Sequence, residues 1–514
     1  MIPAADSCAI RSGAIRSSAI RSSAISSGGA MSSGSSGGAN NGLSWGASSG
    51  AMPWSTEQEA AGTQGRNVVL GCAWLLMFMT IFAVDDDTSS GISVEWLLYF
   101  KMACRVVAFC VLNLSLMRFL YESRAWDVMR RVVPWVLFSA WSLLTITWSP
   151  TPVWSTGQLW TLVIYVTFAA HVAVSIRSAD DVSFLLKGLS IGLLAINGGI
   201  IVLRLVAPEL TGLSRLQPSV IGDATSLAAS ASLGLLLLVA AHQLWGWTWT
   251  RSLLVPGIAI HGTMMLLAAS RTSFAATALS IGYLFTRHSR RGVLWTTVLA
   301  ISFGIGAYVV SDPDLGLSEL ALQRVERYID RENDPDQYRT TFNGRTQVWE
   351  IAWTSFAASP WLGQGYYNIA PTATVELWGH EQRAHAHNLP LQMLVSTGVI
   401  GFLLWTWAMG APYWRALSGS RVGRDVDRAT SRRIWEFALV VGGWFFLWCQ
   451  FTVSFMGTPQ VETSIYFALV GLLWAEDCNR SGALLEPGAR SEPDGRRGFN
   501  AHFGPAALPG TRGS

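Results

Sequence analysis

The sequence of 514 residues is poor in charge. Asp, Glu, Lys and Arg make up only 13% of it, whereas 50% of the residues are hydrophobic and 25 are tryptophan. A soluble domain of this length carries more charge, so the composition argues against a soluble protein and predicts a polytopic membrane protein. The formal net charge of +3 is small, and we expect no nucleic-acid partner.

Cysteine is also scarce, and the familiar catalytic motifs are missing. The six cysteines lie in apolar runs or in the tails, and no pair has the spacing of metal ligands. We therefore predict neither a disulfide framework nor a metal site. There is no P-loop, dinucleotide fingerprint or Ser-His-Asp order, so an ATP-driven pump and a soluble-type hydrolase have no support.

Both ends of the chain have little that could form a core. Residues 1–65 are rich in Ser, Gly and Ala and repeat a pentad from Ala9 to Gly28. Such a segment cannot bury enough apolar surface to fold, and we predict that it is disordered and dispensable, with Met52 as an alternative start. Residues 479–514 are rich in Pro, Gly and Arg and are predicted to be a disordered cytoplasmic tail.

Between these tails, apolar runs of membrane-crossing length recur with polar breaks. They predict an all-α fold with twelve transmembrane helices, nine within residues 66–311 and three within 389–478. The first run lacks the cleavage site of a secretory signal and is predicted to be retained. The expected spans are 68–84, 96–117, 132–148, 158–175, 184–206, 219–241, 253–269, 272–287, 293–311, 389–411, 435–456 and 460–475.

Basic residues predict the orientation of these spans. With a cytoplasmic N-terminus every arginine-rich loop falls on the cytoplasmic side, as the positive-inside rule requires, and the C-terminus is also cytoplasmic. The long insertion 312–388 then lies outside, and its six arginines are outweighed by eleven acidic residues. Helical spacing within 317–329 and 349–356 predicts two amphipathic helices in this loop. A loop of this length is usually functional, and we interpret it as a lid.

Four cations on the outer side are candidate anion ligands. Arg215 and Arg271 each stand at the outer mouth of a span, and Lys101 and Arg105 share one face of the second span. A guanidinium matches phosphate oxygens, and a charge inside a span is costly unless it faces a cavity or a partner. The alternative is that each side chain snorkels to the membrane surface.

Histidines before the tenth span are the candidate proton acceptors. His387 adjoins the predicted cap Asn388, where the helix dipole disfavours an imidazolium and keeps the ring neutral. His385 and His380 are weaker candidates, and Glu350 is a reserve because a carboxylate in an acidic loop is usually solvated. The alternative is that Asn388 simply caps the helix and the imidazoles point to water.

Several segments resemble one family. Asn343–Glu350, Ser359–Tyr366, Ala386–Asn388 and Leu391–Gly401 are similar to the signature region of the O-antigen ligase and polymerase superfamily of bacterial envelope proteins. Thr147–Pro152 and Ser270–Thr272 resemble its exopolysaccharide-polymerase branch. The best-matched part runs from about residue 265 to 405.

The resemblance implies an inverting, metal-independent membrane glycosyltransferase without a cofactor. Its donor is a glycan on a polyprenyl diphosphate at the outer leaflet of the bacterial inner membrane, and its acceptor is a saccharide. By this resemblance Arg215 and Arg271 hold the diphosphate and His387 assists the acceptor hydroxyl. We assign the remaining candidates to substrate binding: Arg345, Lys101, Arg105 and His385.

Three functions remain open from the sequence. We expect a polysaccharide polymerase that extends a lipid-linked oligosaccharide, with a ligase acting on lipid A core or another acceptor as the alternative. A transporter of lipid-linked glycans is the alternative from another class, but we see no internal inverted repeats that would favour it. Pro390 stands where family members commonly carry a larger residue, which leaves the choice between His385 and His387 open. The bilayer and other polysaccharide-assembly proteins are expected partners.

The role of the loop aromatics is also open. They could stack on sugar rings, or they could pack the lid and anchor it at the membrane interface. These residues are Trp349, Trp353, Trp361, Tyr366, Tyr367 and Trp378.

Overall fold

A computed structural model describes most of the chain from residue 54 to residue 485. The described ranges are 54–79, 95–207, 224–268, 270–288, 345–372, 374–377, 380–382, 385–419, 425–452 and 460–485. Several expectations lie outside them: the pentad repeat, the ninth span, the surface helix within 317–329, Arg215, Trp378 and the tail after residue 485.

Long helices make up nearly all of the described chain. One antiparallel hairpin accompanies them, in which β1 (Val375–Leu377) pairs with β2 (His380–Gln382). The helices are α1 (Trp54–Met79), α2 (Glu95–Met117), α3 (Ser123–Ile146), α4 (Pro152–Ser175), α5 (Ala179–Val206), α6 (Ala224–Trp245), α7 (Thr248–Ala268), α8 (Arg271–His288), α12 (Arg345–Ala358), α13 (Leu389–Gly419), α14 (Asp425–Cys449) and α15 (Val461–Leu485).

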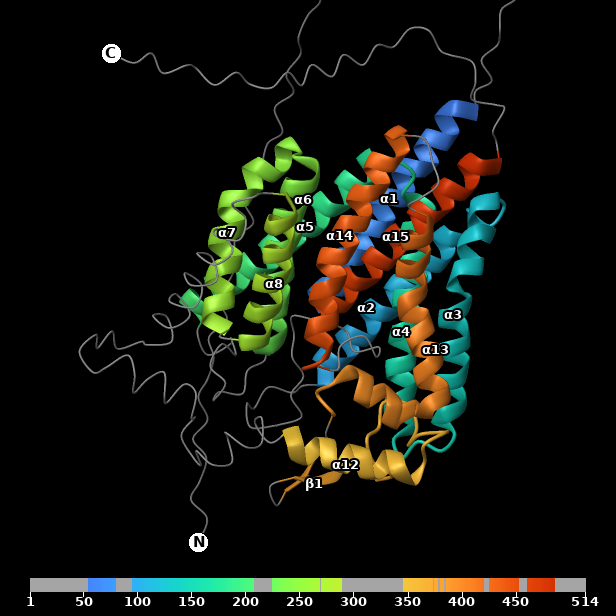
Figure 1. The fold of residues 1–514 in the computed structure, drawn as a ribbon, viewed down its shortest axis with the longest axis vertical. Coiled ribbons are helices and arrows are strands. Elements are labelled where there is room, and N and C mark those ends of the chain that lie inside the picture. Colours follow the sequence, from blue (N-terminus) through green and yellow to red (C-terminus); the bar gives the residue numbers. More distant parts are fainter. Residues whose placement is uncertain are drawn as a thin grey trace, which may run out of the picture. The chain divides into compact units, whose positions relative to one another are not determined.

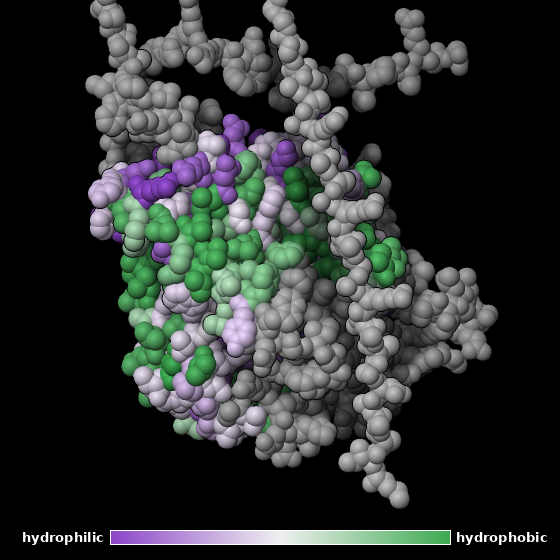
Figure 2. All heavy atoms as spheres, turned by 180° about the vertical axis from the view of Figure 1, so that it is seen from behind, coloured by the Kyte–Doolittle hydropathy of each residue, from purple (hydrophilic) through white to green (hydrophobic). Residues whose placement is uncertain are grey.

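Eleven of these helices occupy expected spans, and α12 occupies the second expected loop helix. Six helices in the described residues are long and apolar enough to cross a membrane, namely those at 99–117, 152–175, 179–206, 225–245, 248–268 and 389–417. A broad apolar band crosses one face of the molecule, with hydrophilic residues along its upper edge (Figure 2). The protein is therefore a polytopic helical membrane protein, and the total of twelve spans stays a prediction.

The helices pack in two groups, which meet through α14, between α1 and α5, and between α15 and α6. In Figure 1, α5 to α8 lie together on one side, while α1 to α4, α13 and α15 lie together on the other. Helix α14 contacts α6 and α8 in the first group and α13 and α15 in the second. The core of the second group is aromatic, with Trp135, Tyr165 and Phe467 in ring contact and fully buried.

Local sequence sets several helix ends. Ser178 and Asp181 form a capping box at the start of α5, since each side chain accepts a backbone N–H of the other residue. Pro152 starts α4, where a missing N–H costs nothing.

Helix α1 begins at Trp54, inside the segment 1–65 that the sequence predicts to be disordered. The run from Glu57 to Ala61 explains this difference, because Glu, Gln and Ala are strong helix formers.

One end of the bundle is held by charge, and we call it the basic end. Arg66 pairs with Asp181 at 2.6 Å, and Arg131, only 9% exposed, pairs with Asp477 at 2.7 Å. Arg124 donates to the carbonyl oxygens of Ala173 and Ile176. These contacts join α1 to α5, α3 to α15 and α3 to the end of α4. They lie where the sequence predicts the cytoplasmic side.

Candidate active site

The start of α13 is fixed by its cap. The Asn388 side-chain oxygen accepts the N–H of Leu391 at 3.0 Å, and its backbone oxygen accepts the N–H of Gln392 at 2.9 Å. Its side-chain amide donates to the Gln450 carbonyl at 3.3 Å. Asn388 therefore caps α13, as expected from the sequence, and also ties the start of α13 to the end of α14.

The two histidines before this cap are held in different ways. Between them Ala386 is fully buried, donates its N–H to Gln392 at 2.8 Å and accepts from the Trp349 indole at 2.7 Å. His387 is exposed and has φ of +46°, a left-handed conformation that is uncommon outside glycine. His385 is half-buried and lies edge-on to the Tyr367 ring, with centroids 4.9 Å apart. Backbone strain of this kind concentrates at functional sites.

Helix α13 is broken at Gly398, about two and a half turns after its start. Its φ of +68° and ψ of −176° are not helical. The break exposes backbone groups that a loop satisfies, since Gln364 donates to the Val395 carbonyl and Val399 donates to the Pro360 carbonyl, both at 2.9 Å. A side chain at Gly398 would overlap the Trp361 carbonyl. The loop after α12 is thus inserted into the break.

Asn368 joins this loop to the turn between α3 and α4. Its amide donates to Ser149 at 2.8 Å and to the Tyr366 carbonyl at 3.1 Å, and its side-chain oxygen accepts from Thr151 at 2.9 Å. Its own carbonyl accepts from Ser396 of α13 at 2.7 Å. Asn368 is therefore a hydrogen-bonded hub between residues far apart in the sequence.

The buried hub continues to the histidine segment. Gln392 donates to Ser396 at 3.1 Å and accepts from Ala386, and Tyr366 donates its backbone N–H to Thr145 at 3.1 Å. Burial raises the pKa of the Tyr366 hydroxyl well above its usual value, so this side chain stays neutral. We call this assembly of the Ser149–Thr151 turn, the Ser359–Ala370 loop and the start of α13 the loop end.

The loop aromatics divide between the two roles left open by the sequence. Tyr366 and Tyr367 are buried and pack within the loop end. Trp349 is half-buried and hydrogen-bonded to the loop backbone. Trp353 and Trp361 are exposed, by 53% and 65%, so of the five described loop aromatics these two present the widest surfaces to a sugar or to the membrane interface.

Arg345 lies beside the cap of α13. It is the first residue of α12, and its guanidinium carbon stands 5.8 Å from the centroid of the Phe451 ring. Phe451 directly follows Gln450, which accepts the hydrogen bond from Asn388. The structure therefore brings Arg345 and the segment around His387 to the same end of α14. Glu350, further along α12, is exposed.

Arg271 is the first residue of α8, and the second turn of this helix is hydrogen-bonded to α14. Ser273 donates to Ser270 at 3.1 Å, and the indole of Trp444 donates to Thr277 at 3.2 Å. Trp444 lies six residues before Gln450. The last two turns of α14 therefore meet the start of α8 on one side and the start of α13 on the other. Arg215 lies outside the described residues.

Lys101 and Arg105 lie elsewhere, on the face of α2 that packs against α1 and α4. Lys101 is only 9% exposed, which disagrees with a side chain that snorkels to the surface. In the described ranges, no group of three or more His, Cys, Asp or Glu residues could hold a metal ion.

Sequence reasoning missed two residues that organise the site. Asn368 carried no motif signal beyond its place after the Gly-Gln-Gly-Tyr turn. Gly398 lay within a segment assigned to one continuous span, whereas the structure breaks that helix there. A glycine in a run of small residues was the available signal, because glycine alone adopts such a conformation without penalty.

Fold and site together define a multi-span helical membrane protein with a broken helix, into which a loop docks at one end. Residues 256–406 match a family model described as O-antigen ligase, and this range contains Arg271, Arg345, His387 and Gly398. A curated relative from Pseudomonas aeruginosa, named O-antigen ligase, is 24% identical over 349 residues, which cover 66% of this chain and 75% of that protein. Over these residues the chain is therefore similar to O-antigen ligases.

Proposed function

We propose that this protein transfers a glycan from a polyprenyl-diphosphate-linked donor to a hydroxyl of a saccharide acceptor, at the periplasmic face of the bacterial inner membrane. One observation carries the proposal: the segment of His387, the start of α12 with Arg345 and the start of α8 with Arg271 all meet the last turns of α14. The similarity of residues 256–406 to the O-antigen ligase family model supports the class of substrate.

The chemistry needs an imidazole and cations, and no nucleotide or metal. The bond between the anomeric carbon and the diphosphate oxygen breaks as the acceptor oxygen attacks from the opposite face, which inverts the configuration. The diphosphate leaves with the electron pair on its lipid. The hydroxyl proton passes to the neutral imidazole of His387 and then to water. Cations stabilise the charge that grows on the leaving oxygen.

His387 is the better of the two histidines for this role. It is exposed and directly precedes the cap of α13, where the positive end of the helix dipole disfavours a second positive charge. His385 instead packs against Tyr367, and we assign it to substrate binding. Arg271 and Arg215 hold the diphosphate, with Arg345 as a further contact.

The orientation follows from charge. The basic end, with Arg66, Arg124 and Arg131, faces the cytoplasm together with both termini, and the loop end faces the periplasm. Membrane-impermeant labelling of a cysteine introduced at exposed Trp361 tests this arrangement. Labelling from the cytoplasmic side alone would reject the proposal.

The polymerase is our first candidate. The ligase is the second, and the name of the Pseudomonas aeruginosa relative, O-antigen ligase, favours this second candidate. Glycan analysis of a deletion strain separates them. Single repeat units without chains indicate loss of a polymerase, whereas full-length lipid-linked polymer left unattached indicates loss of a ligase. Lipid-linked units retained on the cytoplasmic face would indicate a transporter instead.

Substitution of the proposed base tests the mechanism. We expect His387→Ala to lower the transfer rate by about 100-fold or more, the usual contribution of a general base, and to leave donor binding largely intact. Arg271→Ala should weaken donor binding as well. His242→Ala on α6 is the control, since His242 bonds Thr250 away from the loop end. Normal polymer assembly by His387→Ala would show that another residue accepts the proton.

A further inference from the structure

A second group of polar residues lies within the bundle, between α2, α4 and α15. On α2 the buried positions recur every three or four residues, which defines the face turned to α1 and α4. These buried positions are Lys101, Cys104, Ala108 and Leu112. Lys101 thus occupies a place in this stripe where an apolar residue is expected.

Neither cation on this face forms an ion pair with a residue that the structure describes. Among the described residues Lys101 makes no hydrogen bond or ion pair, and the Nε atom of Arg105 is buried without a hydrogen-bond partner. Arg105 lies one turn further along α2, and its positive charge repels that of Lys101. Two like charges on one buried face destabilise the fold unless a group of opposite charge binds beside them.

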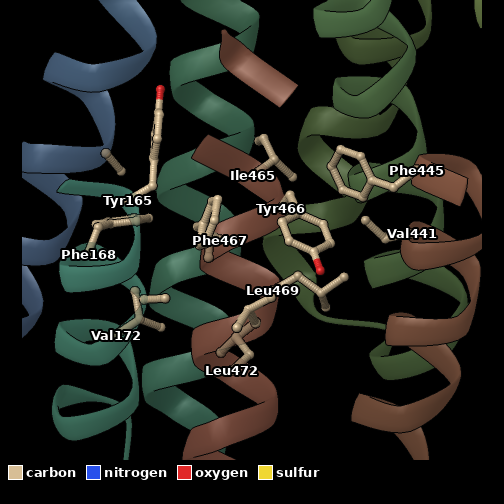
Figure 3. Close-up of a cluster of buried hydrophobic side chains, with 14 of the residues drawn as sticks. Tyr165, Phe168, Val172, Val441, Phe445, Ile465, Tyr466, Phe467, Leu469 and Leu472 are labelled. Carbon is tan, nitrogen blue, oxygen red and sulfur yellow. The ribbon is translucent and has the colours of Figure 1, made fainter. Parts of the chain in front are cut away.

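Polar groups of α4 and α15 complete the cluster. Tyr165 stacks on Phe467, and its hydroxyl points away from Phe168 and Val172 (Figure 3). This hydroxyl donates to the carbonyl of Gln460, just before α15, at 3.5 Å, and it interacts electrostatically with Arg105. Gln158 lies two turns earlier on α4, is 6% exposed, and has a buried side-chain oxygen without a hydrogen-bond partner in the described chain.

One carboxylate belongs to the same cluster. Glu462 is fully buried in the first turn of α15 and acts electrostatically on Tyr165. It offsets one of the two cations, so the cluster keeps an excess positive charge.

We infer that this cluster binds the phosphate of a membrane lipid, with Lys101 as the principal ligand and Arg105 beside it. Helix α2 exposes Met102, Val106 and Val107 on its opposite face, as expected for a helix in contact with lipid. A lipid can therefore lie along α2 while its headgroup reaches the polar side. The phosphate belongs to a polyprenyl diphosphate or to an anionic phospholipid.

The inference deepens the proposed function by adding a phosphate subsite, but its test does not require transfer activity. Full-length protein is placed in phosphatidylcholine nanodiscs and titrated with undecaprenyl diphosphate. We expect Lys101→Met to weaken binding by about tenfold or more, the usual effect of losing a charge-assisted hydrogen bond. Lys101→Arg should retain binding. Lys187→Met is the matched control, because Lys187 is an exposed lysine on α5.

A stability measurement separates binding from a structural role. Without added lipid, Lys101→Met should unfold at the same temperature as the wild type or at a higher one, because it removes a buried charge without a partner. A lower unfolding temperature that Lys101→Arg does not restore would overturn the inference. Unchanged lipid binding in Lys101→Met would overturn it as well.

Two further arms identify the lipid and isolate the subsite. If excess phosphatidylglycerol abolishes the difference between wild type and Lys101→Met, the site holds anionic phospholipid, and if the difference persists it holds the isoprenoid diphosphate. Both results support a phosphate site.

The Lys101→Met effect should also persist in an Arg271→Ala background. If Arg271→Ala alone changes nothing while Lys101→Met still weakens binding, the proposed donor site fails and this subsite stands.

Discussion

At the basic end, ion pairs join the helices, whereas at the loop end neutral side chains and backbone groups join them. Arg131 and Asp477 represent the first kind of contact, and Asn368 with Ser149 and Thr151 represents the second. The hydrogen-bonded hub around Asn368 contains no carboxylate. Its side chains therefore add no negative charge at the place where we propose that a diphosphate binds.

The largest expected effect tests how the loop docks into α13. Gly398→Ala should destabilise the protein by about 3 kcal/mol or more, because the added carbon overlaps the Trp361 carbonyl in a backbone conformation that alanine avoids. Thermal unfolding in detergent measures this. Gly410→Ala in the same helix is the control, since nothing lies within 4 Å of a carbon added there, and its stability should be unchanged or slightly higher. Equal unfolding temperatures for the two variants would contradict the docking.

A smaller effect is expected at the hub itself. Asn368→Ala removes side-chain hydrogen bonds with Ser149, Thr151 and the Tyr366 carbonyl and should cost about 2 kcal/mol of stability. We also expect it to reduce transfer, since the hub connects to the backbone beside His387 through Gln392. Thr156→Ala, which removes an exposed hydrogen bond to Pro152, serves as the comparison. Full activity in Asn368→Ala would separate the hub from the site.

The smallest effect is expected at the basic end. Arg131→Met should lower stability by about 1–2 kcal/mol, because it leaves Asp477 without its partner in a partly buried position. The adjacent Arg130→Met should change little, since Arg130 is 83% exposed and stands 3.7 Å from Asp127. Neither variant should alter the rate of transfer once folded. A rate loss in Arg131→Met at full folding would show that the two ends are coupled.

The basic end could be predicted from the sequence, whereas the hydrogen bonds of the loop end could not. Arginine clusters marked the basic end directly, because orientation follows from local charge in short loops. At the loop end, motif segments were recognised singly, but nothing in their spacing indicated that residues 149, 368 and 396 share one hydrogen-bonded hub. Such contacts depend on how distant segments fold together.

By itself the sequence determined the helical class, the placement of the apolar segments, and local signals such as the Asn388 cap with Pro390 behind it. The length of an apolar segment and the cap of a helix depend only on residues close together in the sequence, so both can be predicted from the sequence. Only the tertiary structure decided that α13 breaks at Gly398 to receive a loop and that Lys101 faces inward. The reason is physical: burial and backbone pairing are set by neighbours that lie far away along the chain.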